Sequence, residues 1–125
     1  MNLGYVIIYV DDCKKASEFY TQALGLTTHY VCESGLYVEM STGATRLAFA
    51  NSSLLHESTG LEYGISEKKS MEIGFTTDDV SKMYHNAVQN GAIPVKEPVT
   101  KPWGQTVSYV QDPFGTLIEI CSVIH

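Results

Sequence analysis

Two carboxylates lie in apolar segments that have the alternation of β-strands. Glu119 lies between Ile118 and Ile120 in the run LIEIC, and Glu72 precedes Ile73 in the run MEIGFT. Successive side chains of a strand point to opposite faces, so each glutamate faces away from the isoleucines beside it. A carboxylate among apolar neighbours is costly unless it is paired, protonated or used. These two residues are therefore the first candidates for binding or chemistry.

Large aromatic and apolar side chains recur on the predicted strand faces that carry these carboxylates. The chain has 8 tyrosines and 1 tryptophan. Flat aromatic faces with polar rims suit a planar or amphipathic organic ligand. The candidate ligand-binding residues are Tyr5, Ile7, Tyr9, Tyr37, Leu47, Phe49, Glu72, Trp103, Tyr109 and Glu119. No motif for a nucleophile or a phosphate-binding loop stands out, so catalytic residues stay unassigned.

The elements that must position these residues occur twice in the sequence. Residues 5–10 predict a buried strand, Asp11-Asp12 an N-cap, and the apolar spacing up to Leu24 a helix that Gly25 ends. Strands are expected at 27–32, 36–40 and 45–50. The second half repeats this order with a strand at 71–76, a helix ending at Gly91, and strands from 93, 105 and 116. The sequence therefore predicts an α+β fold in a single domain over 1–125, with module one at 1–50, a linker at 51–70 and module two at 71–125.

Superposition of the two halves pairs the candidate positions. Matching Asp11-Asp12 with Asp78-Asp79 pairs Tyr5 with Glu72. Matching Gly43 with Gly115 before the last strand of each half pairs Leu47 with Glu119. On this alignment only the second half has carboxylates at the paired positions.

Two segments carry a resemblance to a known family. The runs VDDCKKASEFYTQALGL and WGQTVSYVQDPFGTLIEI, in this order and spacing, resemble the glyoxalase, bleomycin-resistance and extradiol-dioxygenase superfamily, also called the vicinal oxygen chelate fold. The resemblance covers essentially the whole chain. It implies two βαβββ modules that form a curved mixed sheet around a cleft, with the helices on the outer face. It also implies a homodimer, often with exchanged modules, and a place for Trp103 at the mouth of the cleft.

The resemblance also allows a test for a metal site. Metal-dependent members place His, Gln or Glu ligands on the first, fourth, fifth and eighth strands, which here correspond to Tyr5, Leu47, Glu72 and Glu119. Tyrosine and leucine are poor ligands for a divalent ion, which normally needs three or more protein ligands. The sequence therefore favours no metal and no other cofactor. Its four histidines are scattered and form no ligand pair.

Three functional interpretations remain open from the sequence. The first is a metal-free protein that binds a hydrophobic or cationic small organic molecule, with Glu72 or Glu119 offsetting positive charge. The second is an enzyme, a lyase or dioxygenase, in which Glu72 and Glu119 hold a divalent metal ion. The third is a protein used only for association, with a vestigial pocket.

Composition limits the partners and the compartment. The formal net charge of −6 disfavours nucleic acid and anionic membrane surfaces. No apolar run reaches the roughly 20 residues that span a bilayer, and the N-terminal segment lacks the features of a secretory signal. Cys13, Cys32 and Cys121 have no metal or disulfide spacing and are expected to be reduced. A cytoplasmic homodimer is the expectation.

Overall fold

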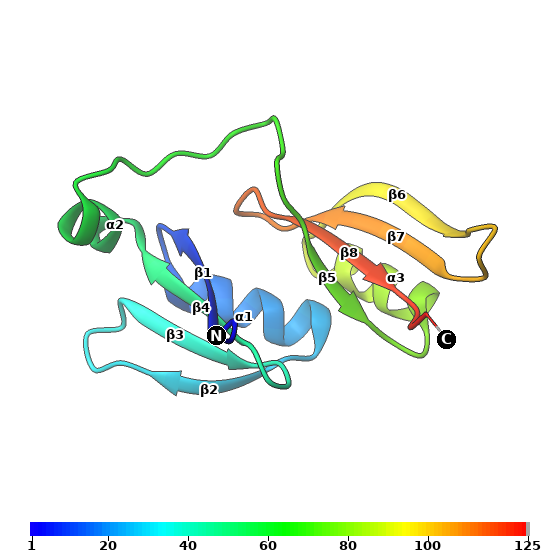
Figure 1. The fold of residues 1–125 in the computed structure, drawn as a ribbon, viewed down its shortest axis with the longest axis horizontal. Helices are drawn as coiled ribbons and strands as arrows, with labels where there is room; N and C mark the ends of the chain where they lie inside the picture. Colours follow the sequence, from blue (N-terminus) through cyan, green and yellow to red (C-terminus); the bar gives the residue numbers. More distant parts are fainter. Residues whose placement is uncertain (125) are drawn as a thin grey trace. The chain divides into compact units, whose positions relative to one another are not determined.

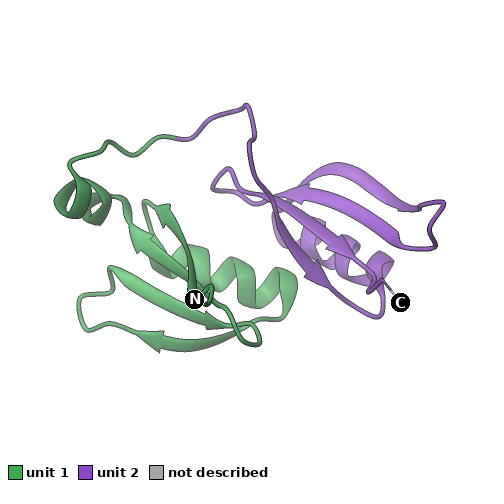
Figure 2. Ribbon diagram, viewed as in Figure 1, with its two compact units in different colours: residues 1–64 green, residues 65–125 purple. Residues whose placement is uncertain are grey.

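The computed structural model describes residues 1–124 and divides into two compact units (Figure 2). Unit 1 comprises residues 1–64 and unit 2 begins at Ile65. Each unit contains its own four-stranded mixed sheet (Figure 1). The predicted α+β fold with a repeated βαβββ unit is confirmed. Enclosure of a cleft by the two sheets stays a prediction.

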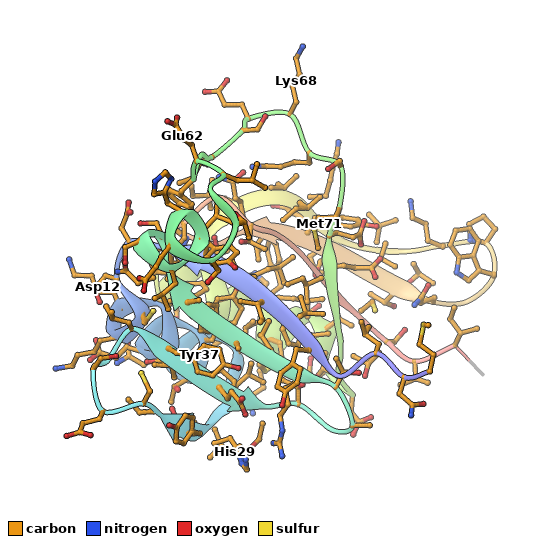
Figure 3. The ribbon with its side chains drawn as sticks, turned by 60° about the vertical axis from the view of Figure 1, so that its left-hand side comes forward. Asp12, His29, Tyr37, Glu62, Lys68 and Met71 are labelled. Carbon is orange, nitrogen blue, oxygen red and sulfur yellow. The ribbon has the colours of Figure 1, made fainter. Side chains whose placement is uncertain are left out.

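Unit 1 follows the predicted order from strand to helix to three strands. Its elements are β1 (Tyr5–Val10), α1 (Cys13–Leu24), β2 (Thr27–Val31), β3 (Tyr37–Ser41) and β4 (Arg46–Asn51). The sheet order is β1-β4-β3-β2, with β1 parallel to β4 and the other pairs antiparallel. Asp12 lies at the start of α1 (Figure 3), where its carboxylate accepts a hydrogen bond from the Lys15 backbone N–H at 3.0 Å. Gly25 ends the helix with a φ of 71°, in the left-handed region.

Unit 2 repeats this arrangement. Its elements are β5 (Ile73–Thr76), α3 (Val80–Gln89), β6 (Ile93–Thr100), β7 (Thr106–Gln111) and β8 (Leu117–Cys121). The sheet order is β5-β8-β7-β6, again with one parallel pair, β5 with β8. Asp79 caps α3 through the Lys82 backbone N–H at 3.1 Å. The two aspartate caps therefore place equivalent helices after equivalent strands.

Strand β6 begins where the sequence predicts, at Ile93, and extends to Thr100. It contains Pro94 and Pro98, which lack the N–H that a regular ladder requires. The strand lies at the edge of its sheet, where a missing N–H faces no partner strand. Its pairing with β7 shifts register between Pro94 and Lys96 and again between Lys96 and Val99. These irregularities accommodate both prolines.

The expected linker contains a helix that the sequence pattern does not predict. Helix α2 (Ser52–Thr59) has no buried residue, so no apolar stripe signals it. Its ends are capped: the Asn51 side chain accepts from the Ser53 N–H, and Gly60 has a φ of 75°. Further along, the Lys69 ammonium donates to the Gly115 carbonyl at 2.6 Å. None of the helices in residues 1–124 has the length and apolar character needed to cross a membrane.

Candidate functional site

In unit 1, α1 covers one face of the sheet, and we call the other the helix-free face. The rings of Tyr20 on α1 and Phe49 on β4 lie 4.9 Å apart, which identifies the helix face of β4. Strand alternation and register then place Tyr5, Ile7 and Tyr9 of β1 on the helix-free face. Tyr37 of β3 (Figure 3) shares this face, because it pairs with Ala50, which pairs with Tyr9.

Leu47 and Phe49, two of the candidate ligand-binding residues, lie on the opposite face. Leu47 is 4% exposed and Phe49 is fully buried in the core beneath α1. The residues of β4 on the helix-free face are instead Arg46, Ala48 and Ala50, which pair with Tyr5, Ile7 and Tyr9. The prediction that Leu47 and Phe49 of β4 lie on the same face as Tyr5 and Tyr9 is therefore wrong by one position along the strand.

The same shift corrects the pairing between the two halves. Glu119 pairs with Gly74 across β5 and β8, and the equivalent pair in unit 1 is Ile7 with Ala48. Glu119 thus corresponds to Ala48 and not to Leu47. The cause is loop length: β4 begins three residues after Gly43, whereas β8 begins two residues after Gly115. The correspondence of Tyr5 with Glu72, which rests on the aspartate caps, is unaffected.

The helix-free face of unit 1 also carries a carboxylate that sequence reasoning missed. Glu39 accepts a hydrogen bond from the Tyr37 hydroxyl at 2.8 Å. Its other carboxylate oxygen, Oε1, lies 3.9 Å from Nε of Arg46. Burial, followed by the hydrogen bond and charge of Glu39, raises the pKa of Tyr37. The signal was available, because Glu39 lies between the buried Val38 and Met40 just as Glu119 lies between two isoleucines.

In unit 2, Glu119 lies on the sheet face turned away from its buried neighbours. The Tyr109 hydroxyl donates a hydrogen bond to its Oε2 at 2.9 Å. Gly74 lies opposite on β5, and a Cβ there would be 3.3 Å from Oε1 of Glu119. The absent side chain at Gly74 therefore leaves room for the carboxylate. Glu72 is exposed just before β5 and two residues from Gly74, which places it on the same side by alternation.

Gln105 and Cys121 lie between Glu119 and the exposed tryptophan. The Trp103 Nε1–H donates to Oε1 of Gln105 at 3.0 Å. The Cys121 thiol is near both Gln105 and Glu119, and both side chains act on its pKa. Sequence reasoning assigned no role to Gln105 and treated Cys121 as a reduced core residue. Their contacts come from strand register, which short-range sequence patterns do not specify.

The electrostatic field around Glu119 is negative. The hydrogen bond to Glu119, then burial, and then the charges of Glu119 and Glu72 raise the pKa of Tyr109 to about 12. Burial, the hydrogen bond to Glu119 and the charges of Glu119 and Glu72 raise the pKa of Cys121 to about 11. Both groups stay neutral donors at physiological pH. The two carboxylates therefore act on the same small region of unit 2.

The donor set does not fit a divalent metal ion. Within residues 1–124, no three side chains of His, Cys, Asp or Glu converge as a metal site requires. Near Glu119, Tyr109 and Cys121 are protonated at neutral pH, and the Tyr109 hydroxyl uses its proton to donate a hydrogen bond to the carboxylate. We therefore derive no chemical step through a metal.

Solved structures share this fold over nearly the whole chain. A glyoxalase-related enzyme from Fulvimarina pelagi matches 98% of this chain and 88% of its own, with a TM-score of 0.84 and 18% identity. A glyoxalase/bleomycin resistance protein/dioxygenase family enzyme from Burkholderia phytofirmans PsJN matches 98% of this chain and 99% of its own, with a TM-score of 0.80 and 22% identity. At these identities the similarity establishes the fold alone.

Sequence comparison gives the family. The uncharacterized protein YraH of Bacillus subtilis (strain 168) is 29% identical over 133 residues, which cover 99% of this chain and 100% of that protein. The model of the Glyoxalase/Bleomycin resistance protein/Dioxygenase superfamily matches residues 2–120. With its two βαβββ units and the match over almost its full length, the chain belongs to the Glyoxalase/Bleomycin resistance protein/Dioxygenase superfamily.

Proposed function

We propose that this protein binds a small cationic organic molecule with an aromatic or apolar body, without a metal ion. The observation that carries the proposal is the position of two carboxylates in one region of unit 2: Glu119, whose Oε2 accepts a hydrogen bond from the Tyr109 hydroxyl at 2.9 Å, and Glu72 nearby. The hydrogen bond to Glu119, burial and then the charges of both glutamates raise the pKa of Tyr109 to about 12. A cation placed there would be attracted by the negative charges of both Glu72 and Glu119. The hydrogen bond from the Tyr109 hydroxyl holds the Glu119 carboxylate in place, so little ordering is needed when a ligand binds.

Aromatic surface supports the choice of ligand class. The Trp103 side chain is 62% exposed and connects to Glu119 through Gln105 and Cys121. An indole ring can stack on a planar ligand and attract its positive charge. These features favour a planar cation over a polar anion or a sugar.

Titration of the single tryptophan tests the proposal. A planar aromatic cation such as ethidium is added to the full-length protein, and Trp103 fluorescence is followed to saturation. Glu119→Gln keeps the shape of the side chain but removes its charge, and we expect at least a tenfold loss of affinity, since a hydrogen-bonded charge contributes about 1.5–3 kcal/mol. Glu18→Gln on the exposed surface of α1 is the matched control and should bind as the unaltered protein does. Absence of a saturable response, or equal affinity for an anionic dye of similar size, would overturn the proposal.

Metal analysis tests the enzymatic alternative. Protein purified without chelator should contain substoichiometric Zn, Ni, Mn or Fe, unchanged in the Glu119→Ala variant. Near-stoichiometric metal that is lost in Glu119→Ala would replace the proposed binder with a metal-dependent enzyme. The measurement needs no knowledge of the substrate.

A further inference from the structure

We propose that the helix-free face of unit 1 contains a separate binding site for a zwitterion, whose ammonium binds Glu39 and whose carboxylate binds Arg46. An amino acid with an aromatic or large apolar side chain is the class of ligand that this arrangement fits. The site extends small-molecule binding to unit 1 and does not depend on the cation proposed near Glu119.

The two charged side chains form an open ion pair. The distance of 3.9 Å between Arg46 Nε and Glu39 Oε1 is too long for a hydrogen bond. Glu39 is held from the other side by the Tyr37 hydroxyl on Oε2. Its Oε1 therefore keeps its capacity to accept a hydrogen bond from a ligand, although the Glu39 side chain is only 14% exposed. A carboxylate this buried gains much from a charged donor.

Arg46 presents its donors to a second partner. Within residues 1–124 its ion pair uses Nε, and no acidic oxygen lies within 4.0 Å of its two terminal nitrogens. Those nitrogens form the planar fork that binds a carboxylate through two parallel hydrogen bonds. The side chain is 36% exposed, so the fork is accessible. A ligand with both signs of charge on adjacent carbons would satisfy Glu39 and Arg46 together, whereas a simple cation would be repelled by Arg46.

Three tyrosines supply the apolar surroundings. Tyr30 on β2 pairs with Glu39, Tyr5 on β1 pairs with Arg46, and Tyr37 lies two residues from Glu39 on β3. The rings of Tyr30 and Tyr37 are 6.5 Å apart and tilted by 54°. Between β1 and β3, strand β4 adds Arg46 and the short side chains of Ala48 and Ala50 to this face. The tyrosine rings can therefore contact the body of a ligand whose charged groups reach Glu39 and Arg46.

Three ligands with the same phenyl body separate the contributions of charge. Phenylalanine carries both charges, phenethylamine only the ammonium, and 3-phenylpropionate only the carboxylate. Each is titrated into the full-length protein, and binding is followed by calorimetry and by the NMR signals of β3 and β4. We expect phenylalanine to bind at least tenfold more tightly than either singly charged analogue. Equal affinities for the three ligands would overturn the proposal.

Paired variants assign the two charges. Glu39→Gln should lower the affinity for phenylalanine and phenethylamine at least tenfold and leave the affinity for 3-phenylpropionate unchanged or higher. Arg46→Gln should lower the affinity for phenylalanine and 3-phenylpropionate at least tenfold and leave the affinity for phenethylamine unchanged or higher. Arg46→Lys keeps the charge but loses the fork, and an intermediate loss is expected. Tyr37→Phe leaves both charges and should weaken phenylalanine by releasing the Glu39 carboxylate. It also tests the site if Glu39→Gln fails to fold. Glu119→Gln should leave phenylalanine binding unchanged. If phenylalanine binding is lost in Glu119→Gln and unaffected in Glu39→Gln, the site does not lie in unit 1.

Discussion

Two groups beside Glu119 ionise only at high pH. The Tyr109 hydroxyl donates a hydrogen bond to its carboxylate, and the nearby Cys121 thiol, which is 4% exposed, has its pKa raised by burial and by that carboxylate. A negative charge on either donor would be placed directly against the carboxylate. The site is therefore built for neutral donors, and its integrity depends on pH.

The stability of the protein should fall in alkaline solution because of Cys121. An ordinary cysteine has a pKa of 9.0, whereas burial and Glu119 raise the pKa of Cys121 to about 11 in the folded protein. Between these values the unfolded chain has released a proton that the folded protein still holds, so rising pH favours unfolding. We expect the free energy of unfolding to be unaffected by this group below pH 9 and to fall by about 2 kcal/mol towards pH 11, since each pKa unit corresponds to about 1.4 kcal/mol.

Urea denaturation at a series of pH values measures this loss. The Cys121→Ala variant should be less stable at neutral pH, because it leaves a small cavity, and should lose less stability as the pH rises. Cys13→Ala is the comparison variant: burial raises the pKa of Cys13 as well, but Glu119 does not act on it, so this variant should reduce the alkaline loss by less than Cys121→Ala does. An alkaline slope that is identical in Cys121→Ala and in the unaltered protein would contradict the assignment.

At the scale of single elements, β4 determines which side chains reach each face of unit 1. Phe49 lies against Tyr20 with its ring 4.9 Å away and is fully buried, whereas Ile7 on the helix-free face is 43% exposed. We expect Phe49→Ala to lower the free energy of unfolding by about 3–5 kcal/mol, the usual cost of removing a buried phenylalanine. Ile7→Ala should cost less than about 1 kcal/mol, because much of its side chain already contacts water. Equal losses in urea denaturation would contradict the observed register.

The strands and helices were largely predictable because their signals are local. The aspartate caps at Asp12 and Asp79, the left-handed glycine at Gly25 and the apolar spacing of α1 and α3 all lie within a few residues of the structure that they specify. Helix α2 has caps but no apolar stripe, so periodicity could not reveal it. The end of strand β6 was not predictable in the same way, because its prolines are compatible with an edge strand and the order of strands in a sheet is not a local signal.

The candidate site was less predictable because it depends on register between distant strands. Alternation separates Leu47 and Phe49 from Ala48, but only packing against α1 determines which set faces the helix. Aligning Gly43 with Gly115 then gave a one-residue error, because the two loops differ in length. Glu39, like Glu119, lies between two apolar residues, but it is outside the two segments that resemble the family, so the resemblance did not single it out.

At the scale of the whole molecule, the edge strands leave room for a second chain. Every residue of β2 is exposed, and β6 has a single residue that is not. Exposed edges of this kind can be covered by association. We expect a homodimer, about twice the chain mass of 13.8 kDa, by light scattering at micromolar concentration. A monomer under these conditions would contradict this expectation.

The two sheets are hydrogen-bonded independently, and this has a consequence for how copies of the chain could assemble. Within residues 1–124, each sheet is completed by strands of its own unit, and residues 52–72, which include α2, connect β4 to β5. Such a segment acts as a tether, whose length determines the local concentration of one unit around the other. Deleting residues 61–64 would break no ladder hydrogen bond in either sheet, yet it would favour partners from a second chain over the partner on the same chain. Assembly could thus be retuned by tether length alone, while both faces that carry Glu39 and Glu119 stay intact.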